Sequence, residues 1–68
     1  MDIGEWMVEV WNRSHSIGTE VELTDDFGKV EITKTRSNAW QLGSGDAVIK
    51  VEGRTGGYLL DRILPLGG

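Results

Sequence analysis

The chain is 68 residues long, with 7 Lys+Arg against 11 Asp+Glu, a formal net charge of −4, ten glycines, three tryptophans and no cysteine. This length allows one domain with a small core, and the lack of cysteine excludes disulfide scaffolds, Cys-ligated zinc, iron–sulfur clusters and thiol catalysis. Residues 1–34 carry eight acidic and three basic side chains, which argues against non-specific binding to nucleic acid or anionic lipid because like charges repel.

The first predicted element is a strand over residues 5–11, where the side chains alternate with a period of two. Trp6, Val8 and Val10 then face the core. The outer face of this strand combines two large apolar side chains with two acidic ones: Met7, Trp11, Glu5 and Glu9.

Residues 19–35 predict a β-hairpin. Apolar and acidic side chains alternate before and after residues 25–28, where two aspartates and a glycine favour a turn. Four side chains of the two strands are expected to face the core together: Val21, Leu23, Val30 and Ile32.

The rest of the chain alternates short apolar segments with glycine-rich turns. A brief apolar piece at residues 39–42 contains Trp40, and residues 47–52 predict a strand. After a turn at residues 53–57, the segment 61–66 is too short for a free-standing helix. We expect it to form one 3₁₀ turn and a last short strand.

Five to six short strands separated by glycine turns indicate an all-β fold, a small barrel or roll of antiparallel strands. We expect a single domain over residues 1–68, with flexible ends at residues 1–4 and 66–68. The predicted core collects the inward-facing side chains: Trp6, Val8, Val10, Val21, Leu23, Val30, Ile32, Trp40, Leu42, Ile49, Val51, Leu60 and Ile63.

Two resemblances concern the chain after residue 18. SH3-type barrels end in a strand, a one-turn 3₁₀ segment and a short closing strand, and residues 57–66 look like that ending. Over residues 19–66 the architecture resembles a small SH3-like barrel, although no binding motif of SH3 domains is present. Four short segments are similar to small uncharacterised proteins of bacteriophages and prophages, which implies an origin but no activity: Thr35-Arg36-Ser37, Ala39-Trp40, Leu42-Gly43 and Gly56-Gly57-Tyr58.

The sequence indicates no catalytic or metal site. His15 is the only histidine and lies in a polar loop, whereas a catalytic triad needs a base, a nucleophile and an orienting carboxylate in one cleft. One histidine with scattered carboxylates is no zinc site, and Asp25-Asp26 lacks the alternating ligands of a calcium loop. We therefore expect no enzymatic activity, no metal and no cofactor.

The glycine-rich segments 43–45 and 53–57 lie between predicted strands, so they predict turns. A phosphate-binding loop would need a helix after it. The final Gly67-Gly68 is similar to the ending of ubiquitin-like sulfur carriers, a third hypothesis for function. Those carriers have a β-grasp fold with a helix crossing the sheet, and no segment shows the periodicity of such a helix. A plain tail is preferred.

The outer face of the 5–11 strand carries the preferred functional hypothesis, a non-catalytic binding or adaptor module. Exposed Met7 and Trp11 would dock on another protein or on a second copy, and Glu5 and Glu9 would attract a basic partner. Trp11→Ala would then weaken binding and leave the fold intact. In the alternative interpretation, the barrel or a loop covers both apolar side chains.

The second functional hypothesis is a nucleic-acid-binding barrel. Basic side chains beside aromatic rings suit single-stranded nucleic acid, whose bases stack and whose phosphates need neutralising. Trp40 and Tyr58 supply the rings. The basic face would consist of Lys34, Arg36, Lys50 and Arg54. Solvated strand faces explain the same residues, and the net acidity of the chain disfavours this hypothesis.

The sequence also predicts a soluble, cytoplasmic protein. The first residues lack the basic start and apolar run of a signal peptide. No apolar stretch approaches the roughly 18 residues that cross a bilayer.

Overall fold

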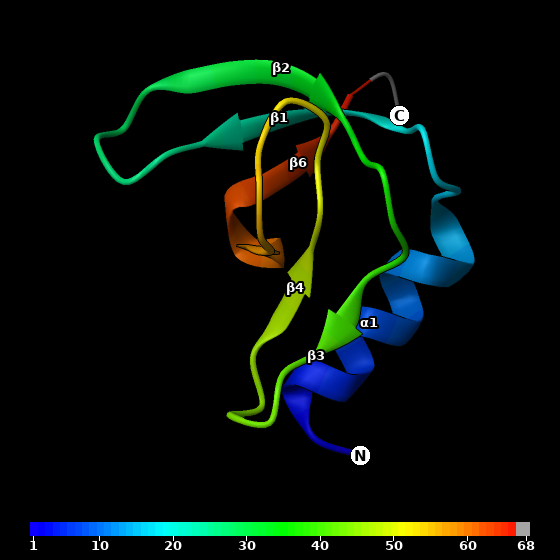
Figure 1. The fold of residues 1–68 in the computed structure, drawn as a ribbon. Coiled ribbons are helices and arrows are strands. Elements are labelled where there is room, and N and C mark those ends of the chain that lie inside the picture. Colours follow the sequence, from blue (N-terminus) through cyan, green and yellow to red (C-terminus); the bar gives the residue numbers. More distant parts are fainter. Residues whose placement is uncertain (67–68) are drawn as a thin grey trace.

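The computed structural model describes residues 1–66 and contains one α-helix, six strands and one 3₁₀ turn (Figure 1). The strands form two three-stranded antiparallel sheets, in the orders β2-β1-β6 and β3-β4-β5. In chain order the elements are α1 (Ile3–Ser14), β1 (Glu20–Thr24), β2 (Val30–Lys34), β3 (Trp40–Gln41), β4 (Ala47–Ile49), β5 (Tyr58–Leu59), η1 (Leu60–Arg62) and β6 (Ile63–Pro65). A fold made mainly of short antiparallel strands, with a 3₁₀ turn near the end, is thereby confirmed, but the described residues also include the helix α1, which the all-β prediction lacked.

Helix α1 occupies the segment predicted as the first strand. Asp2 is its N-cap, and Oδ1 of Asp2 accepts a hydrogen bond from the Glu5 N–H at 2.8 Å. This bond satisfies one of the amides that the first turn of a helix leaves without a partner. Glu5 in the first turn and Arg13 in the last turn also complement the helix dipole. An aspartate followed three residues later by a glutamate is a helix-start signal, and it outweighs the short alternation after it.

Because residues 5–11 are helical, the side chains that are buried differ from those expected for a strand. Three α1 side chains are half-buried and pack against the core: Met7, Val8 and Trp11. Trp6 and Val10, which were expected inside, are 57% and 36% exposed. The prediction that Met7 and Trp11 point outward is therefore wrong, because a helix turns by about 100° per residue and a strand by about 180°.

The predicted hairpin is confirmed, since β1 pairs with β2 in antiparallel register. Its turn is closed by the Asp25 N–H, which donates to the carbonyl oxygen of Lys29 at 2.9 Å. Gly28 adopts a φ of +79° in this turn, a backbone conformation that favours glycine. Three residues therefore separate the closing pair, as in a common type of hairpin loop.

This odd turn length decides which face of β2 is buried. Leu23 pairs with Glu31, and Glu22 pairs with Ile32. Side chains of paired residues share a face, so Ile32 lies on the outer face with Glu22, and Val30 lies there too. Both are more than half exposed. Their predicted place in the core is wrong, because a turn with one residue more or fewer would exchange the faces of β2.

The second sheet lies below the hairpin in Figure 1 and is centred on β4, whose three residues are all buried. The two sheets meet at an isolated bridge between Thr35 and Val51. Thr35 is only 1% exposed, and its hydroxyl oxygen accepts a hydrogen bond from the Gly18 N–H at 3.1 Å. A buried hydroxyl is tolerated when it is bonded in this way, so Thr35 acts as a polar member of the core.

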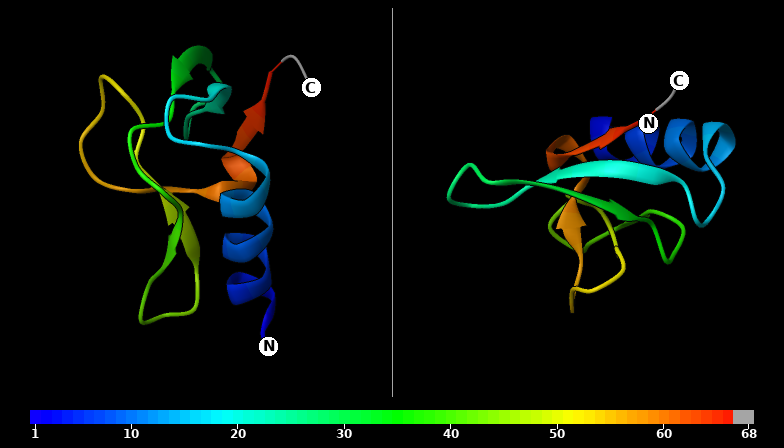
Figure 2. Two further views of the ribbon diagram at one scale, coloured as in Figure 1. Left: turned by 90° about the vertical axis from the view of Figure 1, so that its right-hand side faces the viewer. Right: turned by 90° about the horizontal axis from the view of Figure 1, so that it is seen from above.

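The chain ends as the sequence predicted, with the 3₁₀ turn η1 followed by the short strand β6. β6 leaves the sheet of β5 and pairs with β1, placing Ile63 opposite Leu23. Arg62 of η1 forms an ion pair with Asp26 of the hairpin turn at 2.8 Å. The two sheets are therefore linked by the Thr35–Val51 bridge and by η1, which joins β5 to β6, but they do not close into a barrel (Figure 2).

The core lies between the two sheets and α1, which contacts β3 and β4. Six predicted core side chains are confirmed as buried: Val21, Leu23, Ile49, Val51, Leu60 and Ile63. Ala39, Ala47 and Val48 complete the buried apolar set. Trp40 is only half-buried, and Leu42 is exposed at the start of a turn, where its N–H donates to the Asp46 carbonyl.

Candidate protein-binding surface

An exposed apolar stripe runs along one side of α1. Ile3, Trp6 and Val10 are 77%, 57% and 36% exposed, and their spacings of three and four residues place them on the same side of a helix. We call these three residues the α1 stripe. Large apolar side chains grouped in this way are typical of interaction sites, whereas single exposed ones are common on any protein.

The α1 stripe borders a groove between the helix and the end of the chain. One hollow, of about 170 Å³, is lined by Trp6, Met7, Val10, Trp11, His15, Leu60 and Ile63. A second hollow, of about 270 Å³, shares Met7 and lies toward the start of α1, where Ile3 and Gly4 meet Asp46 and Asp61. We call the two hollows together the α1 groove. It is apolar along the helix and acidic at its N-terminal end.

The N-terminal end of the α1 groove is fixed by close packing. A Cβ at Gly4 would overlap the carbonyl oxygen of Gly45, so α1 touches the β3–β4 turn backbone to backbone. The Gln41 amide nitrogen donates to Asp2 at 2.8 Å and to the Gly45 carbonyl at 3.0 Å. The Glu5 N–H and the Gln41 amide lower the pKa of Asp2, which keeps this N-cap ionised.

The four predicted protein-binding residues lie on two different sides of the helix. Met7 and Trp11 form part of the groove floor, half-buried against the core. Glu5 and Glu9 are exposed and lie on a side of α1 that faces away from the groove. Trp6 was missed as a contact residue because the assumed period of two assigned it to the core. The capping pattern of Asp2 and Glu5 could have identified the helix and so exposed this error.

His15 closes one end of the α1 groove. Its ring centroid lies 4.5 Å from that of Trp11, with an angle of 47° between the rings. Within residues 1–66, no group of three or more His, Asp or Glu side chains could hold a metal ion. His15 thus serves as a packing neighbour of Trp11, and the absence of catalysis stays a prediction.

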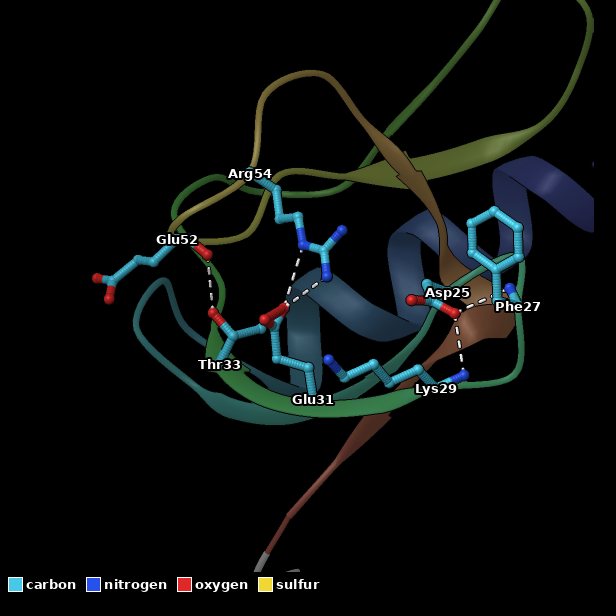
Figure 3. A network of polar contacts seen from close by, with 7 residues as sticks. All are labelled: Asp25, Phe27, Lys29, Glu31, Thr33, Glu52 and Arg54. Carbon is cyan, nitrogen blue, oxygen red and sulfur yellow. Dashed lines mark hydrogen bonds and ion pairs between the residues drawn. The ribbon is translucent and has the colours of Figure 1, made fainter.

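The two aspartates of the hairpin turn both make contacts within the fold, and those of Asp25 are drawn in Figure 3. Oδ1 of Asp25 accepts hydrogen bonds from the N–H groups of Phe27 and Lys29, each at 2.9 Å. Both bonds lower the pKa of Asp25, and the bond from the Lys29 N–H has the larger effect. Asp26 is paired with Arg62. The turn is therefore held by hydrogen bonds and an ion pair, and Phe27 at its tip is 94% exposed.

Three residues of the predicted basic face, Arg36, Lys50 and Arg54, lie next to one another near the bridge that joins the two sheets. The N–H of Arg36 donates to the carbonyl of Lys50 at 2.9 Å, and the Arg36 side chain donates to the carbonyls of Val51 and Arg54. Lys34 accepts a backbone hydrogen bond from Glu52. We call Lys34, Arg36, Lys50 and Arg54 the basic cluster, and its role in binding nucleic acid stays a prediction.

Part of this cluster already serves the structure (Figure 3). Arg54 forms an ion pair with Glu31 at 3.0 Å, and its pKa is raised by Glu31 first and then by Tyr58. Arg54 also lies 5.9 Å from the Tyr58 ring centre, and Lys50 lies at the same distance from the Trp40 ring centre. The aromatic faces that a base would stack on are thus partly covered by cations of the chain itself.

The glycine-rich segments form turns, as predicted, with positive φ angles at Gly45, Gly53 and Gly56. Gly67-Gly68, on which the sulfur-carrier hypothesis depends, lie outside the described residues. The expectation that the chain lacks a helix of about ten residues or more is wrong, because α1 has twelve residues and precedes all six strands.

Across residues 1–66, no helix has the length and apolar character that crossing a membrane requires. Comparison with protein-family models, with curated proteins and with solved structures finds no significant match to this chain. Inference about function therefore starts from the geometry of the α1 groove.

Proposed function

We propose that the chain is a non-catalytic protein-binding module, and that its binding surface consists of the α1 stripe and the α1 groove. Trp6 carries this proposal, because it is 57% exposed beside an apolar hollow. Tryptophan is enriched among the few residues that dominate binding energy, especially next to a well-packed pocket. A partner side chain inserted between Trp6 and Leu60 would bury apolar surface on both sides.

The charges around the groove favour a basic partner. Asp46 and Asp61 line its N-terminal end. Within residues 1–66 the ion pairs are Arg54–Glu31 and Arg62–Asp26, so neither groove carboxylate is paired with a cation there. Oδ2 of Asp46 accepts a hydrogen bond from the Ser44 hydroxyl. Such rim charges contribute to the rate and orientation of docking more than to affinity.

The proposed module has an SH3-like architecture and comes from a phage or prophage. The hairpin and the η1–β6 ending support an SH3-like relationship, with the two sheets left open. The segments similar to bacteriophage and prophage proteins support an accessory role in a phage, for which a small non-catalytic module that binds a bacterial protein is suitable.

Trp6→Gln should weaken partner binding. The immobilised wild-type chain is expected to retain a bacterial protein, and Trp6→Gln should raise the dissociation constant for the identified partner at least tenfold, as a lost hot spot does. Glutamine keeps the helix propensity. Titration calorimetry with the purified partner provides the measurement.

Ile32→Thr is the matched control, because Ile32 is 58% exposed on the outer face of β2. It should bind like the wild-type chain. Equal binding by Trp6→Gln and the wild-type chain would contradict the proposed surface.

A second candidate function is binding of single-stranded nucleic acid by the basic cluster. The proximity of Arg36 to Lys50 and Arg54 favours it. Because Arg36 and Arg54 hold the fold together, reversing Lys34 and Lys50 is the cleaner test. The wild-type chain should bind a short oligonucleotide at low salt and Lys34→Glu/Lys50→Glu should not, in a fluorescence-anisotropy titration. Absence of binding by the wild-type chain at low salt would remove this candidate.

A further inference from the structure

We propose that the α1 stripe packs antiparallel against the α1 stripe of a second copy, so that two chains form a dimer with twofold symmetry. This inference rests on the proposed function, because it assigns an occupant to the same surface. Three features of the described residues favour a second copy as the partner: the spacing of the stripe, the distribution of charge along it and the small size of the core.

The stripe has the spacing of a helix–helix seam. Ile3, Trp6 and Val10 follow one another at intervals of three and four residues, the pattern by which paired helices bury two side chains in every seven. Arg13 occupies the next position of the same pattern. In an antiparallel pair centred on the helix, Trp6 of each chain lies opposite Val10 of the other. A large side chain then meets a small one, and the surface is self-complementary as a twofold interface requires.

Charge selects the antiparallel arrangement. The acidic end of the groove, with Asp46 and Asp61, lies beside Ile3 at the start of α1. Arg13 lies in the last turn and forms no ion pair within the described residues. Antiparallel packing places Arg13 near the partner's Ile3, and therefore near the partner's Asp61. Parallel packing would place acid beside acid and base beside base, which costs free energy.

The size of the chain makes such a partner useful. Nine apolar residues are buried within residues 1–66, while 4441 Å² of surface is accessible to solvent. Domains this small are often stabilised by association. A specific interface removes about 800 Å² from each partner, roughly a fifth of this surface. Glu9 lies about 60° around the helix from Trp6. In this arrangement the Glu9 side chains of the two chains approach each other, and their repulsion limits the affinity of the dimer. We therefore expect a reversible dimer.

Sedimentation equilibrium of the purified chain tests the inference. Between about 1 μM and about 1 mM, the range in which interfaces of modest affinity associate, the mass should rise from that of a monomer to that of a dimer. Arg13→Glu should weaken the dimer at least tenfold. Asp61→Arg in the Arg13→Glu background should restore association, because it exchanges the two charges across the interface. Trp6→Gln should abolish the dimer, and Ile32→Thr should not change it.

The outcomes separate this inference from the proposed function. A wild-type chain that remains monomeric at the highest concentration overturns the dimer, while the proposed function still stands if Trp6→Gln weakens binding of a different protein. A dimer that is insensitive to Trp6→Gln and Arg13→Glu also overturns the inference, because it uses another surface. Loss of association in Arg13→Glu with no recovery in the double variant overturns the antiparallel arrangement.

Discussion

Replacing Trp11 by alanine is expected to lower the free energy of unfolding by about 2–3 kcal/mol, somewhat less than the loss for a fully buried tryptophan. The indole packs against the core and against the His15 ring, and its removal leaves a cavity under α1. A domain of this length has a total stability of roughly 3–10 kcal/mol, so the variant should be largely unfolded at modest urea concentrations. Urea denaturation followed by far-ultraviolet circular dichroism measures the change.

Trp6→Ala is the matched comparison, because the same side chain is removed from a more exposed position of the same helix. At low micromolar concentration its free energy of unfolding should stay within about 0.5 kcal/mol of the wild-type value, as is usual for exposed positions. The reverse result, a stable Trp11→Ala and an unstable Trp6→Ala, is what a strand over residues 5–11 with Trp6 inside would give, and it would refute the helical arrangement.

The parts of the fold that could be predicted are those in which neighbouring residues favour a single local structure. Aspartates and a glycine between two alternating segments specify a hairpin, and β1 and β2 form it. The face of β2 could not be predicted, because the number of residues in the turn depends on how Asp25 closes it through Lys29. One residue in that count moves Val30 and Ile32 from the core to the surface.

The candidate site was obscured by a competition between two periodicities. Over residues 5–11 the alternation of Trp6, Val8 and Val10 fits a strand, and the pair Met7 and Trp11 fits a helix at a spacing of four. Seven residues are too few for either pattern to prevail. The Asp2 cap and the contacts with β3 and β4 resolve it in favour of the helix. The exposed stripe depends on that decision, so sequence analysis considered the same segment but assigned its exposed and buried sides the wrong way round.

Helix α1 is also held by the side chain of Asn12, just after the segment 5–11 that the sequence predicted as a strand. The Asn12 amide nitrogen donates to the carbonyl of Ala39 at 3.0 Å, and the Asn12 amide oxygen accepts from the Ala39 N–H at 2.8 Å. Asparagine can satisfy a backbone donor and acceptor at once because its amide has both groups. Ala39 is 5% exposed, so water cannot easily replace Asn12, and this pair joins the end of α1 to the segment before β3.

Asn12→Ala is therefore expected to cost about 2 kcal/mol of stability, since two backbone groups of a buried residue lose their partners. Ser14→Ala, an exposed substitution in the last turn of the same helix, should be neutral. Asn12→Asp separates the two bonds, because a carboxylate still accepts from the Ala39 N–H but cannot donate to its carbonyl. Native-state hydrogen exchange should show that the Ala39 amide exchanges faster in Asn12→Ala than in the wild-type chain. In Asn12→Asp its exchange should be slower than in Asn12→Ala. Unchanged exchange at Ala39 in Asn12→Ala would show that α1 is held against the sheets by apolar packing alone.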